Sequence, residues 1–179
     1  DTCDETRNFM DELSSITKKI NVEKYDVNES EDIREKYDIK RVPAITILDK
    51  DKKDFGIKFY GIPAGHEINS LITGIMEVSG AGEEIPSEFL EKIEAIDKPI
   101  DIKVFVTLSC PHCPGAVAKA HKLALLNENI KGSMIESQTF SQLAQKYEVQ
   151  GVPKIVINEE HDLVGNQPLD KFLEIIEKI

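Results

Sequence analysis

The pattern of hydrophobic positions predicts helices and strands that alternate along the chain. The stretch 4–20 has apolar side chains at the spacing of one helix face, so a helix is expected there. The same periodicity predicts helices at 30–37, 66–78, 86–96, 115–126, 141–147 and 169–179. Short runs rich in β-branched residues predict strands at 22–27, 44–48, 57–60, 100–108, 132–137, 154–158 and 163–164. This alternation indicates an α/β fold.

The two halves of the chain repeat one pattern at a fixed distance. Residues 36–43 match residues 146–153, and the offset between the two prolines is 153 − 43 = 110 residues. Cys3 falls on Cys113 at the same offset. Because cysteine, tyrosine, proline and the apolar positions agree together, duplication explains the match better than chance.

The Gly-Ala-Gly stretch at 80–82 is the clearest boundary in the sequence, since glycine interrupts both helices and strands. We therefore predict two tandem units, 1–81 and 82–179, each a mixed central sheet flanked by helices. The second unit begins near Glu83, so the offset places roughly 27 residues of the first unit before Asp1. A helix and the first strand of that unit are expected among them.

Composition and charge narrow the classes of function. The net charge of −11 argues against nucleic acid as the main partner. No run of 18 apolar residues is present, so no membrane span is expected. Three cysteines and no visible signal peptide do not fit a secreted disulfide framework, and a cytoplasmic protein is predicted. Residues 1–99 hold 14 Lys and Arg against 23 Asp and Glu, so a non-catalytic binding scaffold using this acidic half stays open.

The stretch with the clearest chemistry is Cys110-Pro111-His112-Cys113. An apolar run leads into it and a helical run follows, which is the arrangement of a dithiol redox site. The unpaired N–H groups and the dipole of a helix N-terminus stabilise a thiolate. Cys110 is therefore predicted to be the nucleophile at the first turn, and Cys113 the resolving thiol one turn further in. His112 would add a donor or a positive charge beside Cys110.

Two other interpretations of the cysteine pair stay open. A Cys-x-x-Cys pair also forms half of a zinc site, but zinc needs four ligands and the chain has no second pair. The pair could also be inert and buried. His121 is expected to be a histidine on a helix face, and no metal site is predicted.

Cys-Pro-His-Cys at a strand–helix junction, followed after 40 residues by Val152-Pro153 before a hairpin and a last helix, resembles the thioredoxin fold. This resemblance implies that Pro153 is cis and lies against the disulfide. It also implies that the backbone beside it, at Val152, is free to pair with a substrate strand. By the repeat, Val42 and Pro43 take these positions in the first unit.

The whole chain is most similar to the glutaredoxin-like protein disulfide oxidoreductases of archaea and thermophilic bacteria, which fuse two thioredoxin-fold units. The stretches 59–67 and 154–157 carry this similarity. It implies a thiol–disulfide oxidoreductase that acts on protein disulfides and dithiols without a cofactor. Stretches 108–110 and 151–153 resemble equally well the module in front of the flavin-dependent reductase of alkyl hydroperoxide reductase systems. That alternative implies an electron relay between a flavin-dependent reductase and a peroxiredoxin.

The chain departs from the thioredoxin pattern at two places. Thioredoxin has a buried Asp in the strand before its cysteines, where this chain has Val104, so a proton acceptor for Cys113 is unassigned. Cys3 matches a resolving cysteine, and its nucleophile would stand just before Asp1. Cys3 is therefore a candidate catalytic residue of the first unit.

Overall fold

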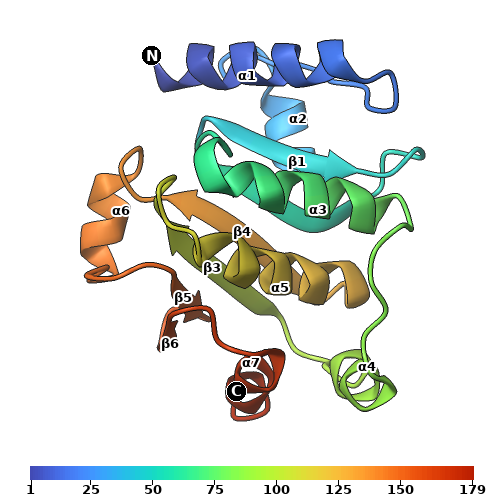
Figure 1. Cartoon of the computed structure of the whole chain (residues 1–179), viewed down its shortest axis with the longest axis vertical. Coiled ribbons are helices and arrows are strands. Elements are labelled where there is room, and N and C mark those ends of the chain that lie inside the picture. The colour runs from blue at the N-terminus through green and yellow to red at the C-terminus, as the bar shows by residue number, and fades with distance from the viewer.

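The computed structural model describes residues 1–179, and its centre is one six-stranded mixed sheet with the order β1-β2-β4-β3-β5-β6 (Figure 1). The strands are β1 (Ala44–Leu48), β2 (Asp54–Tyr60), β3 (Ile100–Val106), β4 (Ile130–Glu136), β5 (Lys154–Ile157) and β6 (His161–Val164). The helices are α1 (Thr2–Ile16), α2 (Glu31–Lys36), α3 (Ile68–Val78) preceded by the 3-10 turn η1 (Gly65–Glu67), α4 (Ser87–Glu94), α5 (Cys113–Leu126), α6 (Ser141–Lys146) and α7 (Leu169–Ile176). None of the helices is long and apolar enough to cross a membrane.

The predicted α/β class, with a mixed sheet flanked by helices, is confirmed. The sheet is shared, however, because β2 from the first half pairs in parallel with β4 from the second half. Each strand would otherwise leave a row of backbone N–H and C=O groups without partners at a sheet edge. The two halves are therefore joined through their backbones. The boundary between units at 81 and 82 stays a prediction.

The strand predicted at 22–27 is wrong, because these residues form no strand. The 110-residue offset places them on β4, which pairs on one side with β3. No strand of the sheet lies beside residues 22–27, so this segment has no neighbour with which it can pair. A β-branched run needs such a neighbour to satisfy its backbone groups.

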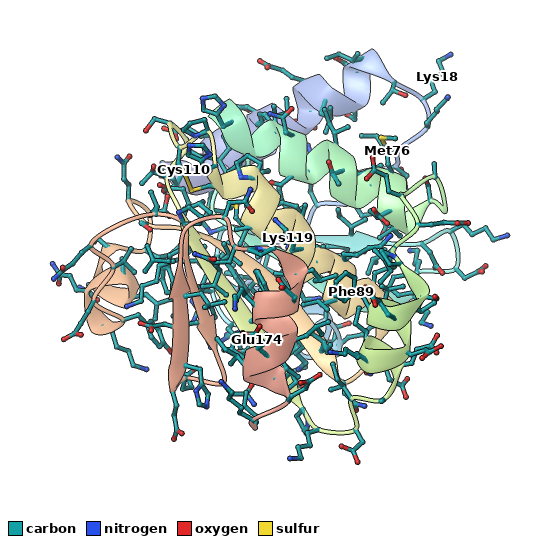
Figure 2. The ribbon with its side chains drawn as sticks, turned by 60° about the horizontal axis from the view of Figure 1, so that its bottom comes forward. Lys18, Met76, Phe89, Cys110, Lys119 and Glu174 are labelled. Carbon is teal, nitrogen blue, oxygen red and sulfur yellow. A yellow bond between two sulfur atoms is a disulfide. The ribbon has the colours of Figure 1, made fainter.

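The alternation of side chains divides the sheet into two faces. On β3, Ile102, Val104 and Val106 belong to the large core under α3, α4, α5 and α7. Phe105 belongs to a smaller core under α6 on the opposite face. Figure 2 shows α5 lying between α3 and α7, with Cys110 at one end of this helix layer and Lys119 further along.

Helix α5 packs closely on the sheet because its buried face is lined mostly by small side chains. Its buried residues are Cys113, Ala116, Val117, Ala120, His121, Leu123 and Ala124. A Cβ atom at Gly132 of β4 would stand 2.6 Å from the carbonyl oxygen of Ala120. A side chain at Gly132 would therefore push α5, and the cysteines at its start, away from the sheet.

His121 lies inside this packing rather than on an open helix face. Its side chain is buried, with Nε2 3.1 Å from the carbonyl oxygen of Lys58 on β2. Its ring packs edge-on against Phe59, at 4.7 Å between centroids. Nδ1 is buried without a hydrogen-bond partner. Burial lowers the pKa of His121 to about 4, because the charged ring would lose its hydration.

We expect His121 to make folding less stable in acid. The unfolded chain binds a proton near pH 6.5 while the folded protein excludes it until about pH 4, so stability is lost as pH falls between these values. The loss attributable to His121 is about 3 kcal/mol at its limit. Urea unfolding from pH 7.5 to 4.5 measures it as the difference between wild type and His121→Gln, whose amide can still donate to Lys58.

His161→Gln on β6 is the matched control for the loss of a histidine. A His121→Gln variant whose unfolding free energy follows the wild-type pH dependence would contradict the assignment.

Candidate redox site

Cys110 and Cys113 form a disulfide at the junction between β3 and α5, with their Cα atoms 5.5 Å apart. After β3, the N–H of Cys110 donates to the carbonyl of Thr107 at 3.1 Å and closes a turn. Helix α5 begins at Cys113, so Cys110 precedes the first helical turn instead of lying within it. The prediction that placed Cys113 one turn into the helix is wrong, because Cys113 is the first residue of α5. The first-turn N–H groups of α5, which have no partner within the helix, therefore begin at Cys113 itself.

The two cysteine residues differ slightly in exposure. Cys110 keeps 8% of its surface exposed, whereas Cys113 has none. Pro111 and His112 between them are exposed, and the His112 side chain makes no capping hydrogen bond to α5. Another thiol or disulfide would therefore reach Cys110 first.

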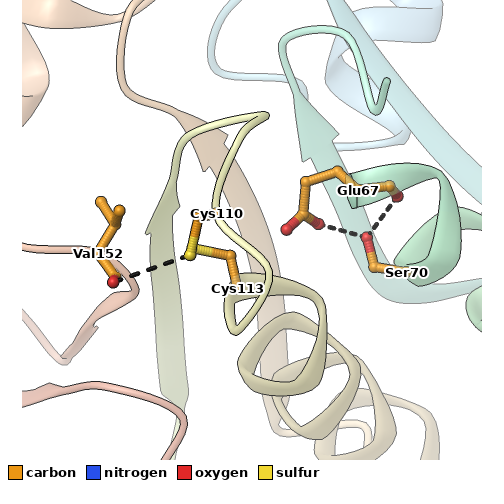
Figure 3. The surroundings of a disulfide bond; sticks show 5 residues. All are labelled: Glu67, Ser70, Cys110, Cys113 and Val152. Atoms are coloured by element: carbon orange, nitrogen blue, oxygen red, sulfur yellow. Dashed lines mark hydrogen bonds between the residues drawn. A yellow bond between two sulfur atoms is a disulfide. The ribbon is translucent and has the colours of Figure 1, made fainter. Parts of the chain in front are cut away.

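The segment before β5 lies against Cys110. The Sγ atom of Cys110 is 3.8 Å from the carbonyl oxygen of Val152 in this segment (Figure 3). The bond between Val152 and Pro153 is cis, as the resemblance implied. Neither the N–H nor the C=O of Val152 has a backbone hydrogen bond. Apart from the contact between the carbonyl oxygen and Cys110 Sγ, these two groups have no partner in the protein.

The first half repeats part of this arrangement. The bond between Val42 and Pro43 is also cis, and Val42 is 40% exposed. Cys3 is a free, partly exposed cysteine in the first turn of α1, as Cys113 is in the first turn of α5. The structure gives Cys3 no disulfide partner, so its catalytic role stays a prediction.

Glu67 is a site residue that the sequence analysis missed. It comes from η1 in the first half, its side chain is fully buried, and Figure 3 shows its carboxyl group on the side of Cys113. Ser70 donates to one carboxyl oxygen, and the other has no partner. Burial raises the pKa of Glu67 to about 7, against the opposing effect of the Ser70 hydrogen bond.

The position of Glu67 depends on a close approach between the two halves. The N–H of His66 donates to the carbonyl of Leu108 at 2.9 Å, two residues before Cys110. At Gly65, which has φ of +57°, a Cβ atom would stand 2.5 Å from the same carbonyl oxygen. Glycine is therefore required there. One sequence signal was available, because helical spacing places Glu67 on the same face as Leu71, which is also buried.

The structure brings no additional metal ligands to the cysteine pair. No group of three or more His, Cys, Asp or Glu side chains is arranged to hold a metal ion. A zinc site would require further ligands from such a group. The geometry therefore favours a dithiol over a zinc ligand pair.

Comparison with known proteins agrees with the fold. Residues 100–178 match the family model of a thioredoxin domain. A Bacillus subtilis protein named NADH dehydrogenase is 27% identical over 97% of this chain, and an alkyl hydroperoxide reductase protein of Staphylococcus aureus is 29% identical over 91%. The chain spans only 31% of the length of each of these relatives.

Two solved structures are similar over nearly the whole chain. An alkyl hydroperoxide reductase protein of Enterococcus faecalis has a TM-score of 0.93 at 29% identity, covering 98% of this chain and 84% of that one. A protein disulfide oxidoreductase of Aeropyrum pernix has a TM-score of 0.89 at 27% identity, covering 99% and 79%. The chain therefore has the fold of these two proteins, and its residues 100–178 form a thioredoxin domain that carries a Cys-x-x-Cys disulfide.

Proposed function

We propose that this chain is a thiol–disulfide oxidoreductase that reduces, forms or exchanges protein disulfides through Cys110 and Cys113. The observation that supports this most directly is the asymmetry of the pair. Cys110 keeps 8% of its surface exposed beside the backbone of Val152, whereas Cys113 has no exposed surface and lies on the side of Glu67. An exposed nucleophile and a protected resolving thiol are the two groups that disulfide exchange needs.

In the reducing direction, the Cys110 thiolate attacks one sulfur of a substrate disulfide. A bond forms between Cys110 and that sulfur, and the other substrate sulfur leaves as a thiolate that takes a proton from water. The Cys113 thiol then gives its proton to Glu67 and attacks the Cys110 sulfur. The Cys110–Cys113 disulfide forms, the second substrate thiol is released, and two electrons have passed to the substrate. An external dithiol restores the reduced pair.

Glu67 suits the role of proton acceptor because of its position and its proton affinity. A pKa of about 7 lets the carboxyl group accept or donate a proton near neutral pH. Its second oxygen is free, so it has room for one more hydrogen bond. Glu67 would therefore accept the proton of Cys113, a role that the buried Asp of thioredoxin suggests for position 104 but that Val104 cannot perform.

The free backbone of Val152 would hold the substrate. Its N–H and C=O can pair with an extended peptide as an added strand does. The same geometry at Val42 supports a second substrate position beside Cys3 in the first half. Use of that position depends on a cysteine partner for Cys3.

The alternative function is an electron relay that takes electrons from a flavin-dependent reductase and passes them to a peroxiredoxin. It is supported by the similarity to the Enterococcus faecalis alkyl hydroperoxide reductase protein across 98% of this chain. A cysteine immediately before Asp1 would favour the disulfide oxidoreductase, because it would complete a second dithiol. A different residue there would favour the relay. A cytoplasmic location is part of both proposals.

Insulin reduction with dithiothreitol tests the proposed activity. We expect the wild-type chain to accelerate precipitation of the insulin B chain and Cys110→Ser to abolish the acceleration, because the attacking sulfur is gone. Cys113→Ser should accumulate a mixed disulfide with the substrate, visible by mass spectrometry. A wild-type chain that leaves the insulin disulfides intact would instead support the binding scaffold.

Alkylation tests which cysteine is the nucleophile. In the reduced Cys3→Ser background, iodoacetamide at pH 6 should modify Cys110 well before Cys113, because only Cys110 keeps any exposed surface. Peptide mass spectrometry after timed quenching gives both rates. Faster modification of Cys113 would reverse the assigned roles.

Glu67→Gln tests the proton acceptor. We expect resolution of the mixed disulfide to slow by about tenfold or more at pH 8, where the wild-type carboxylate is ionised. The change in rate near pH 7 should disappear, because the amide does not titrate. Stopped-flow measurements of substrate thiol release from pH 5.5 to 8.5 follow this step.

Glu88→Gln on α4 is the matched control, since it removes an exposed carboxylate. A Glu67→Gln variant that keeps the wild-type pH profile would remove Glu67 from the mechanism.

A further inference from the structure

The sheet face opposite α5 has a polar area that no helix of the chain covers. Near the carboxyl ends of the central strands this face is apolar and packs under α6, with Phe105 and Ile135 in the small core. On the same face, two residues before these apolar positions along each strand, the side chains are polar: Lys58 on β2, Ser133 on β4 and Lys103 on β3. Strands in the middle of a parallel arrangement are normally apolar on both faces. Three buried polar side chains in the middle of the sheet are therefore unusual and need a physical explanation.

The register of the sheet places these three side chains in one row. Lys58 of β2 stands opposite Ser133 of β4, and Ser133 stands opposite Lys103 of β3. Neighbouring strands lie about 4.8 Å apart, so the two lysine Cα atoms are about 10 Å apart with the serine between them. The exposed fractions are 5% for Lys58, 7% for Ser133 and 8% for Lys103. Two ammonium groups and a hydroxyl thus share one small area.

The lysines are held in place by carboxylates but keep unused donors. Lys58 donates to Asp54 and Thr46. Lys103 donates to Asp101 and Glu159, also through two hydrogen bonds. An ammonium group has three N–H donors, so one remains on each lysine. The Ser133 hydroxyl has no hydrogen bond within the protein, and the row therefore offers donors to an acceptor-rich ligand.

The row forms the floor of a groove of about 780 Å³. Its walls come from the loop after α2, the end of α6 and the turn between β5 and β6. The charged lining residues are Lys40, Arg41, Lys58, Lys103, Lys131 and Lys146 against Asp38, Asp54, Asp101 and Glu159. This lining has a net charge of +2 in a chain whose net charge is −11. The volume is in the range of small-molecule sites.

We propose that this groove binds a small molecule that carries phosphate groups. One phosphate would accept hydrogen bonds from Lys58, Ser133 and Lys103. Lys131, two residues before Ser133 on β4 and hydrogen-bonded only to Asp38, would bind a second phosphate. Charge-assisted hydrogen bonds of this kind are short and strong, and burial strengthens them. The disulfide lies on the other side of the sheet, so this site is independent of the thiol chemistry.

Titration of the ¹⁵N-labelled chain with sodium pyrophosphate tests the site. We expect saturable shifts of the backbone amide signals of β2, β3 and β4 around Lys58, Lys103 and Ser133. Sodium chloride at equal ionic strength should not produce them. Parallel titrations with orthophosphate and glycerol 3-phosphate separate inorganic phosphate from a phosphate ester, and tighter binding of either one identifies the source.

Ser133→Ala and Lys131→Met should each weaken pyrophosphate binding about tenfold, since each removes a charge-assisted hydrogen bond. Lys171→Met on the exposed face of α7 is the matched control and should bind as wild type does. Shifts that grow linearly with ionic strength, saturable shifts elsewhere in the chain, or wild-type affinity in both groove variants would overturn the proposal. Insulin reduction by the same variants should be unchanged, so this result is separate from that of the thiol assay.

Discussion

Four residue pairs between β2 and β4, from Ile57 with Gly132 to Tyr60 with Ile135, join the two halves of the chain in one sheet. The chain leaves β2 at Tyr60, and the following loop brings η1 to the turn before Cys110. By this route Glu67 comes to lie on the Cys113 side of the disulfide. The same pairing sets Lys58 opposite Ser133 and places the carbonyl of Lys58 beside His121. A slip of one residue would move each β2 side chain to the other face.

The environment of each thiol, rather than its identity, separates the roles of the two cysteines. Cys110 lies before the helix, keeps a small exposed surface, and has the Val152 carbonyl beside its sulfur. Cys113 lies three residues later with no exposed surface, near a carboxyl group whose burial holds its pKa near neutrality. In the proposed mechanism, a buried acid from the first half accepts the proton of a cysteine from the second half. The first half is part of the candidate site even though its own cysteine is unpaired.

The buried polar groups on the two faces of the sheet have different hydrogen-bond and ion-pair partners. On the α5 face, burial disfavours the charged form of Glu67 more than its single hydrogen bond, from Ser70, favours it. On the opposite face, Lys58 and Lys103 each have carboxylate neighbours, which compensate much of the cost of burying an ammonium group. The first environment suits proton transfer near neutral pH. The second holds carboxylate-paired ammonium groups at the floor of the proposed phosphate site.

The sequence by itself determined those features that are encoded by residues close together in the chain. Helical and strand periodicities located all but one of the predicted elements, and the Cys-x-x-Cys pair at a strand–helix junction identified the redox site, because these signals lie within one segment. The repeat and the family resemblance located both cis prolines. Tertiary structure alone decided the rest. The strand expected at 22–27 lacks a partner, and β2 and β4 form one sheet across the two halves. Glu67 is brought to the side of Cys113 by a contact between His66 and Leu108, which are more than 40 residues apart, and no local pattern encodes such a contact.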